Sequence, residues 1–162
     1  MSLMDDLKQW FSEAHRTVII GVGNPILRDD NIGVEIVRGL EGRTSKSVFL
    51  IKSEMVPENF LDQIIEFKPT HILIIDAALL NLNPGSAKLI KSLDISRVAI
   101  STHALPIQIF TEYLAKVIGA KIALLLIQPD DTSFGEGLTR ELSLVRKKLV
   151  KYLLKIIDSS TT

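Results

Sequence analysis

Residues 17–25 have the sequence TVIIGVGNP, and this stretch decides the fold. Thr17–Val22 is β-branched and apolar at nearly every position, which predicts a strand buried on both faces, as in a parallel sheet. The glycines and proline of residues 21–25 predict a tight turn at its end. Apolar residues at helical spacing between positions 32 and 40 then predict a helix that opens near Asp30.

The strand-then-helix order continues along the chain. Short apolar runs predict further strands, and segments of helical periodicity between them predict helices. This alternation predicts an α/β fold, a three-layer α/β/α sandwich around a twisted, mostly parallel five-stranded sheet. Residues 98–101 are too short a run to assign. The other expected strands are 48–52, 71–75, 87–91 and 121–127, and the other expected helices are 60–67, 106–118 and 138–157.

A length of 162 residues fits one domain. Residues 3–15 have the spacing of an amphipathic helix, so we expect residues 1–16 to form an N-terminal helical extension that covers part of the sheet. The α/β domain is expected to span residues 17–158. The polar residues 159–162 are expected to be a disordered tail.

Composition excludes several classes of protein. Nineteen basic and nineteen acidic side chains cancel, so no overall charge favours nucleic acid or an anionic membrane. The absence of cysteine excludes disulfides, zinc–thiolate sites and a cysteine nucleophile. No apolar run approaches the roughly 20 residues that span a bilayer. Asp5 and Asp6 near the start are untypical of a secretory signal, and we expect a cytoplasmic protein without membrane insertion.

Three polar side chains follow predicted strands where each strand gives way to a loop. Asp30 follows the first strand and its turn, Asp76 closes the apolar run 72–75, and His103 follows residues 98–102. Ligands of open parallel sheets collect at the carboxyl ends of the strands. Two carboxylates and one imidazole together form a set of metal donors. Taken singly, Asp30 is also a favoured helix N-cap, and Asp29 beside it is assigned a capping or structural role.

The glycine turn does not match a dinucleotide-binding fingerprint. That motif requires a third glycine three residues after Gly23, where this chain has Ile26. Pro25 also removes a backbone N–H that would face a phosphate. Walker A and G-x-S-x-G motifs are absent as well.

A set of short motifs resembles the hydrogenase maturation proteases, the endopeptidases that remove the C-terminal extension of the NiFe hydrogenase large subunit. The motifs occur in the family's order and cover about residues 18–150. They are Gly23-Asn24-Pro25-x-x-x-Asp29-Asp30-x-x-Gly33, Pro57-Glu58-Asn59, Ile75-Asp76-Ala77 with Pro84-Gly85, Ser101-Thr102-His103-x-x-Pro106, and Ile127-Gln128-Pro129 with Gly135 and Leu138.

The resemblance implies both a fold and a site. The fold would be phosphorylase/hydrolase-like, with one antiparallel strand, for which Ala87–Lys91 is the candidate. Asp30, Asp76 and His103 would be the catalytic and metal-contacting residues, with no further cofactor-binding residue. The metal would be nickel that the substrate, a hydrogenase large-subunit precursor, brings with it. A site of three donors is expected to hold the metal poorly without that substrate.

Three departures from the family pattern stand out. Asn31 and Asn81 occupy positions where the family often has glycine, and asparagine tolerates a positive φ. Arg28 stands where small or apolar residues are common and places a cation near Asp30. We also expect residues 55–60 and 130–137 to border an apolar-lined substrate groove, and His71 to be a surface residue at the opposite end of the sheet.

The sequence leaves the general base and several functions open. Either Asp30 or Asp76 is suited to activate water. One alternative function is a metal-assisted peptidase for another precursor, and a second is a non-cleaving protein that senses metal occupancy. A hydrolase built on Ser101, His103 and Asp76 ranks last, because the serine lies in no nucleophile elbow. The oligomeric state does not follow from the sequence.

Overall fold

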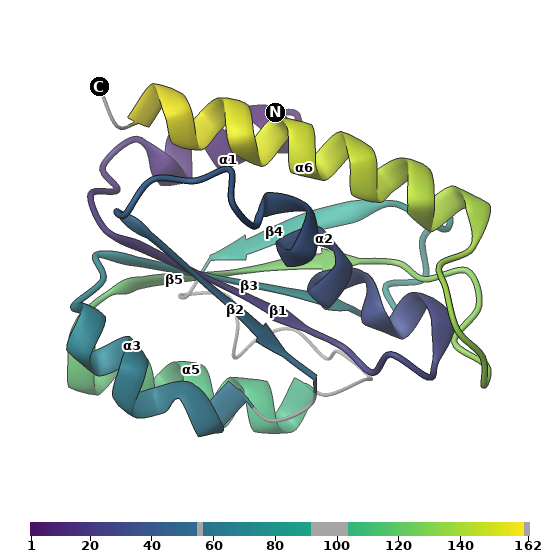
Figure 1. Cartoon of the computed structure of the whole chain (residues 1–162), viewed down its shortest axis with the longest axis horizontal. Coiled ribbons are helices and arrows are strands. Elements are labelled where there is room, and N and C mark those ends of the chain that lie inside the picture. Colours follow the sequence, from purple (N-terminus) through teal and green to yellow (C-terminus); the bar gives the residue numbers. More distant parts are fainter. Residues whose placement is uncertain (55–56, 92–103, 161–162) are drawn as a thin grey trace.

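The centre of the molecule is a five-stranded sheet with the strand order β2-β1-β3-β5-β4 (Figure 1). The computed structural model describes residues 1–54, 57–91 and 104–160. Four strands are parallel, and β4 runs antiparallel to β5. The strands are β1 (Thr17–Val22), β2 (Val48–Ser53), β3 (His71–Ala77), β4 (Ala87–Lys91) and β5 (Lys121–Ile127).

Burial along each strand agrees with its place in the sheet. Every residue of β1 and β3, which lie inside the sheet, is buried, as the continuous apolar runs predict. β4 lies at an edge and is only partly buried, with Lys88 and Lys91 exposed. The predicted antiparallel strand at Ala87–Lys91 is therefore confirmed, with Ala87 opposite Ile127 of β5.

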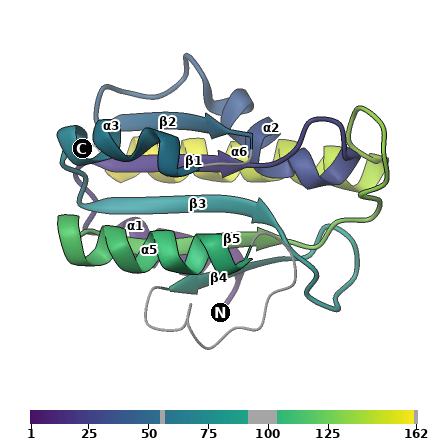
Figure 2. The same cartoon turned by 90° about the horizontal axis from the view of Figure 1, so that it is seen from below.

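Helices cover both faces of the sheet and complete the predicted three-layer sandwich (Figures 1 and 2). One face carries three helices and the other carries two. The first group is α1 (Leu3–Phe11), α2 (Ile32–Leu40) and α6 (Arg140–Ser160), and the second is α3 (Leu61–Phe67) and α5 (Ala104–Ile118). Two short 3-10 helices, η1 (Arg28–Asn31) and η2 (Pro57–Phe60), precede α2 and α3.

The two faces of the sheet have separate apolar cores because side chains alternate along a strand. In β3, Leu73 and Ile75 pack toward α2 and α6, whereas Ile72 and Ile74 pack toward α3 and α5. All four side chains are fully buried. Each contributes about 1.5–3 kcal/mol relative to an exposed position, so the sheet is stabilised from both sides.

Both ends of the described chain are helical. The N-terminal segment forms a helix, as expected, and its Leu7, Trp10 and Phe11 are buried in the core shared by α2 and α6. The helix α1 begins with a capping box between Ser2 and Asp5. At the other end, α6 continues through Ser160, so residues 159 and 160 are helical rather than part of a disordered tail.

His71 is buried, not exposed as predicted. Its side chain is 2% exposed and contacts the ring of Trp10 edge-on at 4.9 Å between centroids. The ring atom Nδ1 lies 2.9 Å from Oγ1 of Thr70. The sequence could not show this contact, because Trp10 of α1 supplies it from 61 residues away.

Residues 98–101, left unassigned from sequence, lie outside the described residues. Within the described part of the chain, no helix is both long and apolar enough to span a membrane.

Candidate functional site

The start of α2 lies directly on the carboxyl ends of β1 and β3. A Cβ atom on Gly33 would lie 2.1 Å from the carbonyl oxygen of Ile75 and 2.5 Å from that of Val22. A Cβ on Gly23 would lie 2.6 Å from the Cα of Asn31. The glycines of this motif therefore allow backbone to pack on backbone, which brings η1 and its acids onto the sheet edge.

Asp30 lies in η1 and is 6% exposed. Its Oδ2 accepts a hydrogen bond of 3.1 Å from the backbone N–H of Asn24, in the turn that follows β1. The residue before α2 is Asn31, and it makes no side-chain capping bond. The carboxylate of Asp30 thus joins its own loop to the end of β1.

Asp76 is the next-to-last residue of β3 and is 1% exposed. By alternation with Ile72 and Ile74, its side chain lies on the sheet face that α3 and α5 cover. Its Oδ1 accepts a 2.8 Å hydrogen bond from the backbone N–H of Ala77. A carboxylate this deeply buried at a strand end is held in place by the sheet itself.

The structure brings Asp30 and Asp76 to the same edge of the sheet. β1 and β3 are hydrogen-bonded neighbours, and η1 contacts β3. Gly33, three residues after Asp30, packs on Ile75, the residue before Asp76. The two acids therefore flank one backbone contact, as expected for residues at the carboxyl ends of adjacent parallel strands.

His103 lies outside the described residues, so its place relative to the two acids is not assigned. The next residue in the sequence, Ala104, begins α5. This helix ends at Ile118, just before β5, and its 15 residues cover about 22 Å. The seven residues of β5 cover about 23 Å beside it. α5 therefore begins level with the carboxyl edge of the sheet (Figure 2).

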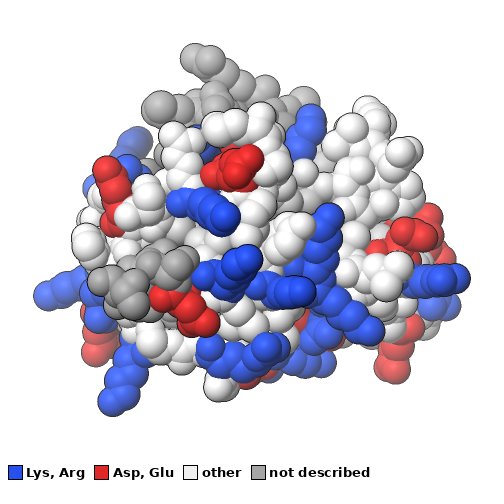
Figure 3. Space-filling view, turned by 90° about the horizontal axis from the view of Figure 1, so that it is seen from above, with Lys and Arg blue, Asp and Glu red and all other residues white. Residues whose placement is uncertain are grey.

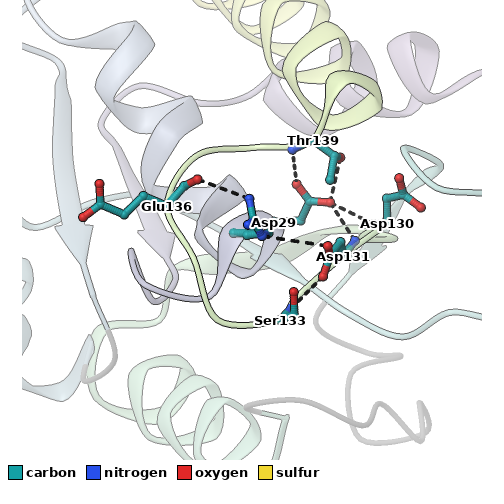
Figure 4. Close-up of polar contacts among 7 residues, drawn as sticks. Asp29, Asp130, Asp131, Ser133, Glu136 and Thr139 are labelled. Atoms are coloured by element: carbon teal, nitrogen blue, oxygen red, sulfur yellow. Dashed lines mark hydrogen bonds and ion pairs between the residues drawn. The ribbon is translucent and has the colours of Figure 1, made fainter.

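Asp29 has the structural role that the sequence suggested, and it anchors the loop between β5 and α6 (Figure 4). Its fully buried carboxylate accepts hydrogen bonds from the backbone N–H groups of Asp130 and Asp131, both at 3.0 Å. Thr139 donates both its backbone N–H and its hydroxyl, each at 2.8 Å. The sequence placed Asp29 correctly but contained no signal for these distant partners.

The anchored loop also pairs with the turn that carries Asp30. Leu27 and Gly135 form an isolated parallel β-bridge. The backbone N–H of Arg28 donates to the carbonyl of Gly135 at 3.1 Å, and the N–H of Gly135 donates to the carbonyl of Ile26 at 2.8 Å. The turn after β1 and the loop after β5 are therefore hydrogen-bonded to each other beside the candidate site.

The loop after β3 is held in a similar way. Gln128, at the end of β5, accepts a 2.6 Å hydrogen bond from the backbone N–H of Leu80 through its side-chain oxygen. Asn81 has a φ of 58°, so the asparagine does take the left-handed turn expected of it. Asn31, in contrast, has a φ of −88° and needs no such tolerance. The left-handed residue of that loop is Arg28, with a φ of 44°.

Exposed apolar side chains and a groove lie at the same edge of the sheet as the two acids. Phe134 is 78% exposed and Leu79 is 51% exposed, and each belongs to a loop at the carboxyl edge. A groove of about 640 Å³ lies between the turn after β1 and the end of β2. Asn59 and Phe60 line it, as expected for the segment 55–60, although Lys52, Ser53 and Glu54 make its wall more polar than predicted.

The described residues supply two carboxylates but no complete metal centre. Within residues 1–54, 57–91 and 104–160, no group of three or more histidine, cysteine or acidic side chains is arranged to hold an ion. Carboxylates at the carboxyl edge of a parallel sheet suit two tasks, donation to a cation and proton transfer with water. Asp30 and Asp76 are therefore the described residues best suited to these two tasks.

Comparison with known proteins identifies relatives along most of the chain. The family model described as hydrogenase maturation protease matches residues 34–156. A putative hydrogenase maturation protease of Methanocaldococcus jannaschii is 39% identical over 164 residues, which cover 96% of this chain and 94% of the relative. The hydrogenase 3 maturation protease of Escherichia coli K12 is 32% identical over 124 residues, which cover 76% of this chain and 79% of the relative.

Solved structures agree with the sequence matches. The crystal structure of a NiFe hydrogenase maturation protease from Thermococcus kodakarensis superposes with a TM-score of 0.86 and is 29% identical. The alignment covers 94% of this chain and 99% of that one. The hydrogenase maturating endopeptidase HybD of E. coli has a TM-score of 0.73 at 22% identity and shows the same fold.

Proposed function

The chain belongs to the hydrogenase maturation protease family and is an endopeptidase of hydrogenase maturation, and from this premise we propose a substrate and a mechanism. The proposed substrate is the large-subunit precursor of a NiFe hydrogenase. The proposed reaction removes the C-terminal extension of that precursor once nickel has been inserted. We place this reaction in the cytoplasm, a compartment that suits a chain without cysteine.

The observation that carries this proposal is the pair of buried carboxylates at one sheet edge. Asp30 and Asp76 are 6% and 1% exposed, and each follows or ends one of two neighbouring parallel strands. Carboxylate and imidazole donors together suit nickel, and His103 would be the third donor. Three donors leave coordination positions for groups of the substrate. The metal would then be bound well only when the precursor brings it, and cleavage would report that insertion is complete.

The bond-breaking step would use water rather than a side-chain nucleophile. A carboxylate positioned near the scissile bond is able to take a proton from water as the water attacks the carbonyl carbon. Nickel held by the precursor would position the peptide and polarise its carbonyl oxygen. Asp30 and Asp76 both remain candidates for the base, because both lie at the carboxyl edge of the sheet. Cleavage of this kind would be of the aspartic type.

The direct test is a processing assay with purified protein and purified precursor, with and without nickel. We expect the nickel-loaded precursor to be shortened at its C-terminus and the nickel-free precursor to stay intact. Mass spectrometry of the product identifies the scissile bond. Equal cleavage of both forms would contradict the nickel requirement. Binding of the loaded precursor without shortening would instead indicate a sensor of metal occupancy.

A further inference from the structure

Arg28, two residues before Asp30, has an unusual backbone conformation. Its φ of 44° lies in the left-handed region, which only a few per cent of non-glycine residues adopt. The conformation is fixed on both sides, by the bond from its N–H to Gly135 and by the buried carboxylate of Asp29. Strained residues of this kind cluster at functional sites, which directs attention to what the side chain does.

The guanidinium of Arg28 is weakly engaged. Its Nε lies 3.8 Å from Oδ2 of Asp131, and its Nη1 donates to the carbonyl of Glu136 over 3.5 Å. Within the described part of the chain, the Nε atom has no hydrogen-bond partner. The group lies against Gly135, where a Cβ atom would approach Nη2 to 2.6 Å. The neighbouring carboxylate of Glu136 points away from the Asp29 cluster in Figure 4.

Other arginines of the same region are satisfied by comparison. Nη1 of Arg38 lies 3.1 Å from Oε1 of Glu35. Nε of Arg146 donates to the backbone carbonyl of Glu35 at 2.8 Å and lies 3.9 Å from its carboxylate. The carboxylate of Glu35 therefore lies within ion-pair distance of two arginines. Arg28 keeps N–H donors for which the protein supplies no short acceptor among the described residues.

A pocket lies beside this guanidinium, whose side chain is 39% exposed although its Nε atom is buried. It has a volume of about 540 Å³ and contains Arg28, Arg38 and Arg146 together with Glu35 and Glu136. We call it the arginine pocket. Its three cations exceed its two acids by one charge. Pro25 and Ile26 line both this pocket and the groove at the end of β2, so the pocket adjoins that groove.

Asp131 does not remove the positive character of Arg28. Hydrogen bonds from the side chain and backbone of Ser133 hold the pKa of Asp131 below its usual value, so this carboxylate stays ionised. Its Oδ1 is occupied by the N–H of Ser133 at 2.8 Å. Its side chain is 47% exposed and keeps a long contact with Arg28, so water screens the attraction.

We propose that Arg28 binds a carboxylate of the substrate polypeptide in the arginine pocket and thereby sets the register of the chain across Asp30 and Asp76. A planar guanidinium with available donors is the side chain best suited to a carboxylate. The ligand is either an acidic side chain of the precursor or its terminal carboxylate. The inference rests on the proposed function, because it assigns a recognition contact to that same substrate.

The first test compares steady-state kinetics of the wild type and Arg28→Asn on nickel-loaded precursor. Asparagine tolerates the left-handed conformation, so the loop is expected to keep its shape. We expect KM to rise about tenfold with kcat unchanged, since a charge-assisted contact is lost from both bound states. Calorimetric binding of the precursor should weaken by the same factor. Arg28→Gly, which adopts this conformation without steric cost, should give the same result.

Two control variants separate recognition from general charge and from loop structure. Arg43→Gln removes a cation from a different groove, which Arg146, Lys147 and Lys151 also line. This groove lies between α2 and α6, in the region where lysine and arginine gather in Figure 3. Asp131→Asn removes the ion-pair partner of Arg28 and leaves the guanidinium in place. We expect KM to stay within about twofold of wild type for Arg43→Gln and not to rise for Asp131→Asn, which removes an acid that competes for the guanidinium.

A double-mutant cycle then identifies the ligand. Precursors with single acidic residues of the extension neutralised, and one with a C-terminal carboxamide, are tested against wild type and Arg28→Asn. Neutralising the group that Arg28 binds should raise KM for the wild type but leave KM for Arg28→Asn unchanged. An unchanged KM for Arg28→Asn, or an equal penalty on every precursor, would overturn the inference while leaving cleavage by the wild type intact. Failure of the wild type to process any precursor would overturn the proposed function itself, and this inference with it.

Discussion

Thr139 donates two hydrogen bonds to Asp29, one from its backbone and one from its hydroxyl, each 2.8 Å long, across 110 residues of sequence. This contact joins the residue beside the candidate catalytic Asp30 to the residue before α6. Because Asp29 is fully buried, its oxygens depend on these donors and on those of Asp130 and Asp131 for hydrogen bonds that water would otherwise supply. Asp29 thus organises the rim of the site without belonging to its chemistry.

Replacement of Asp29 by asparagine should destabilise the protein by about 2–4 kcal/mol, because an amide N–H₂ would face backbone donors that now meet a carboxylate. The free energy of unfolding from urea titration measures the change. Asp130→Asn is the matched control, since its exposed side chain should alter stability by less than about 0.5 kcal/mol. Equal stability of the two variants would mean that the Asp29 carboxylate is not what holds the loop.

Asp76→Asn should abolish processing of the nickel-loaded precursor and leave the protein folded. Asparagine keeps the oxygen that accepts the N–H of Ala77, but it neither carries charge nor takes up a proton. Gel mobility of the precursor and thermal unfolding of the variant are the two measurements. Asp130→Asn again serves as the control and should process at the wild-type rate. Continued cleavage by Asp76→Asn would remove Asp76 from the site.

Gly33→Ala should prevent stable folding, with a loss above about 4 kcal/mol, because the added Cβ would overlap the backbone of β1 and β3. Neither strand is able to move without breaking the sheet. Gly119→Ala is the control, since its φ of 73° carries strain but nothing lies within 4 Å of the added atom. That variant should lose only about 1 kcal/mol. Soluble yield and denaturant titration distinguish the two outcomes.

Stability should fall in mildly acidic solution because of His71. Burial, and secondly the charge of Lys121, lowers the pKa of His71 below its ordinary value. As pH falls through about 6.5, the unfolded chain takes up a proton that the folded protein does not, so unfolding is favoured by at most about 1.4 kcal/mol per pH unit. Above that pH, His71 does not change how the free energy of unfolding varies with pH.

His71→Phe should flatten this dependence, because phenylalanine preserves the ring contact with Trp10 and cannot titrate. Thr70 keeps other partners, including the carbonyl of Arg16. Unfolding titrations between pH 5 and 8 measure the slope in both proteins, with His15→Gln as the control for an exposed histidine. A slope that persists in His71→Phe would assign the effect to another group.

The sheet and its site edge were predictable because their signals are local. The β-branched run of β1 and the alternation of Ala87–Lys91 each depend on neighbouring residues, and both strands were placed correctly. The positions of Asp30 and Asp76 at the carboxyl edge then follow from parallel topology. The metal and catalytic roles of these acids remain predictions, as does the part played by His103.

Other features were beyond the reach of sequence because distant residues create them. The burial of His71 depends on α1, and the anchoring role of Asp29 depends on Thr139. Asn31 was expected to take a left-handed conformation, yet the residue of this loop with a left-handed conformation is Arg28. Turn composition alone did not reveal this, since the pairing of Leu27 with Gly135 decides where the chain bends.

The bridge between Leu27 and Gly135 has a consequence for how quickly a client polypeptide is captured. The turn after β1 and the loop after β5 are hydrogen-bonded to each other in the folded protein. The enzyme therefore loses little conformational entropy in these loops when it binds the precursor. We expect no slow closing motion of these two loops to precede binding. We therefore expect diffusional encounter to set the rate of capture.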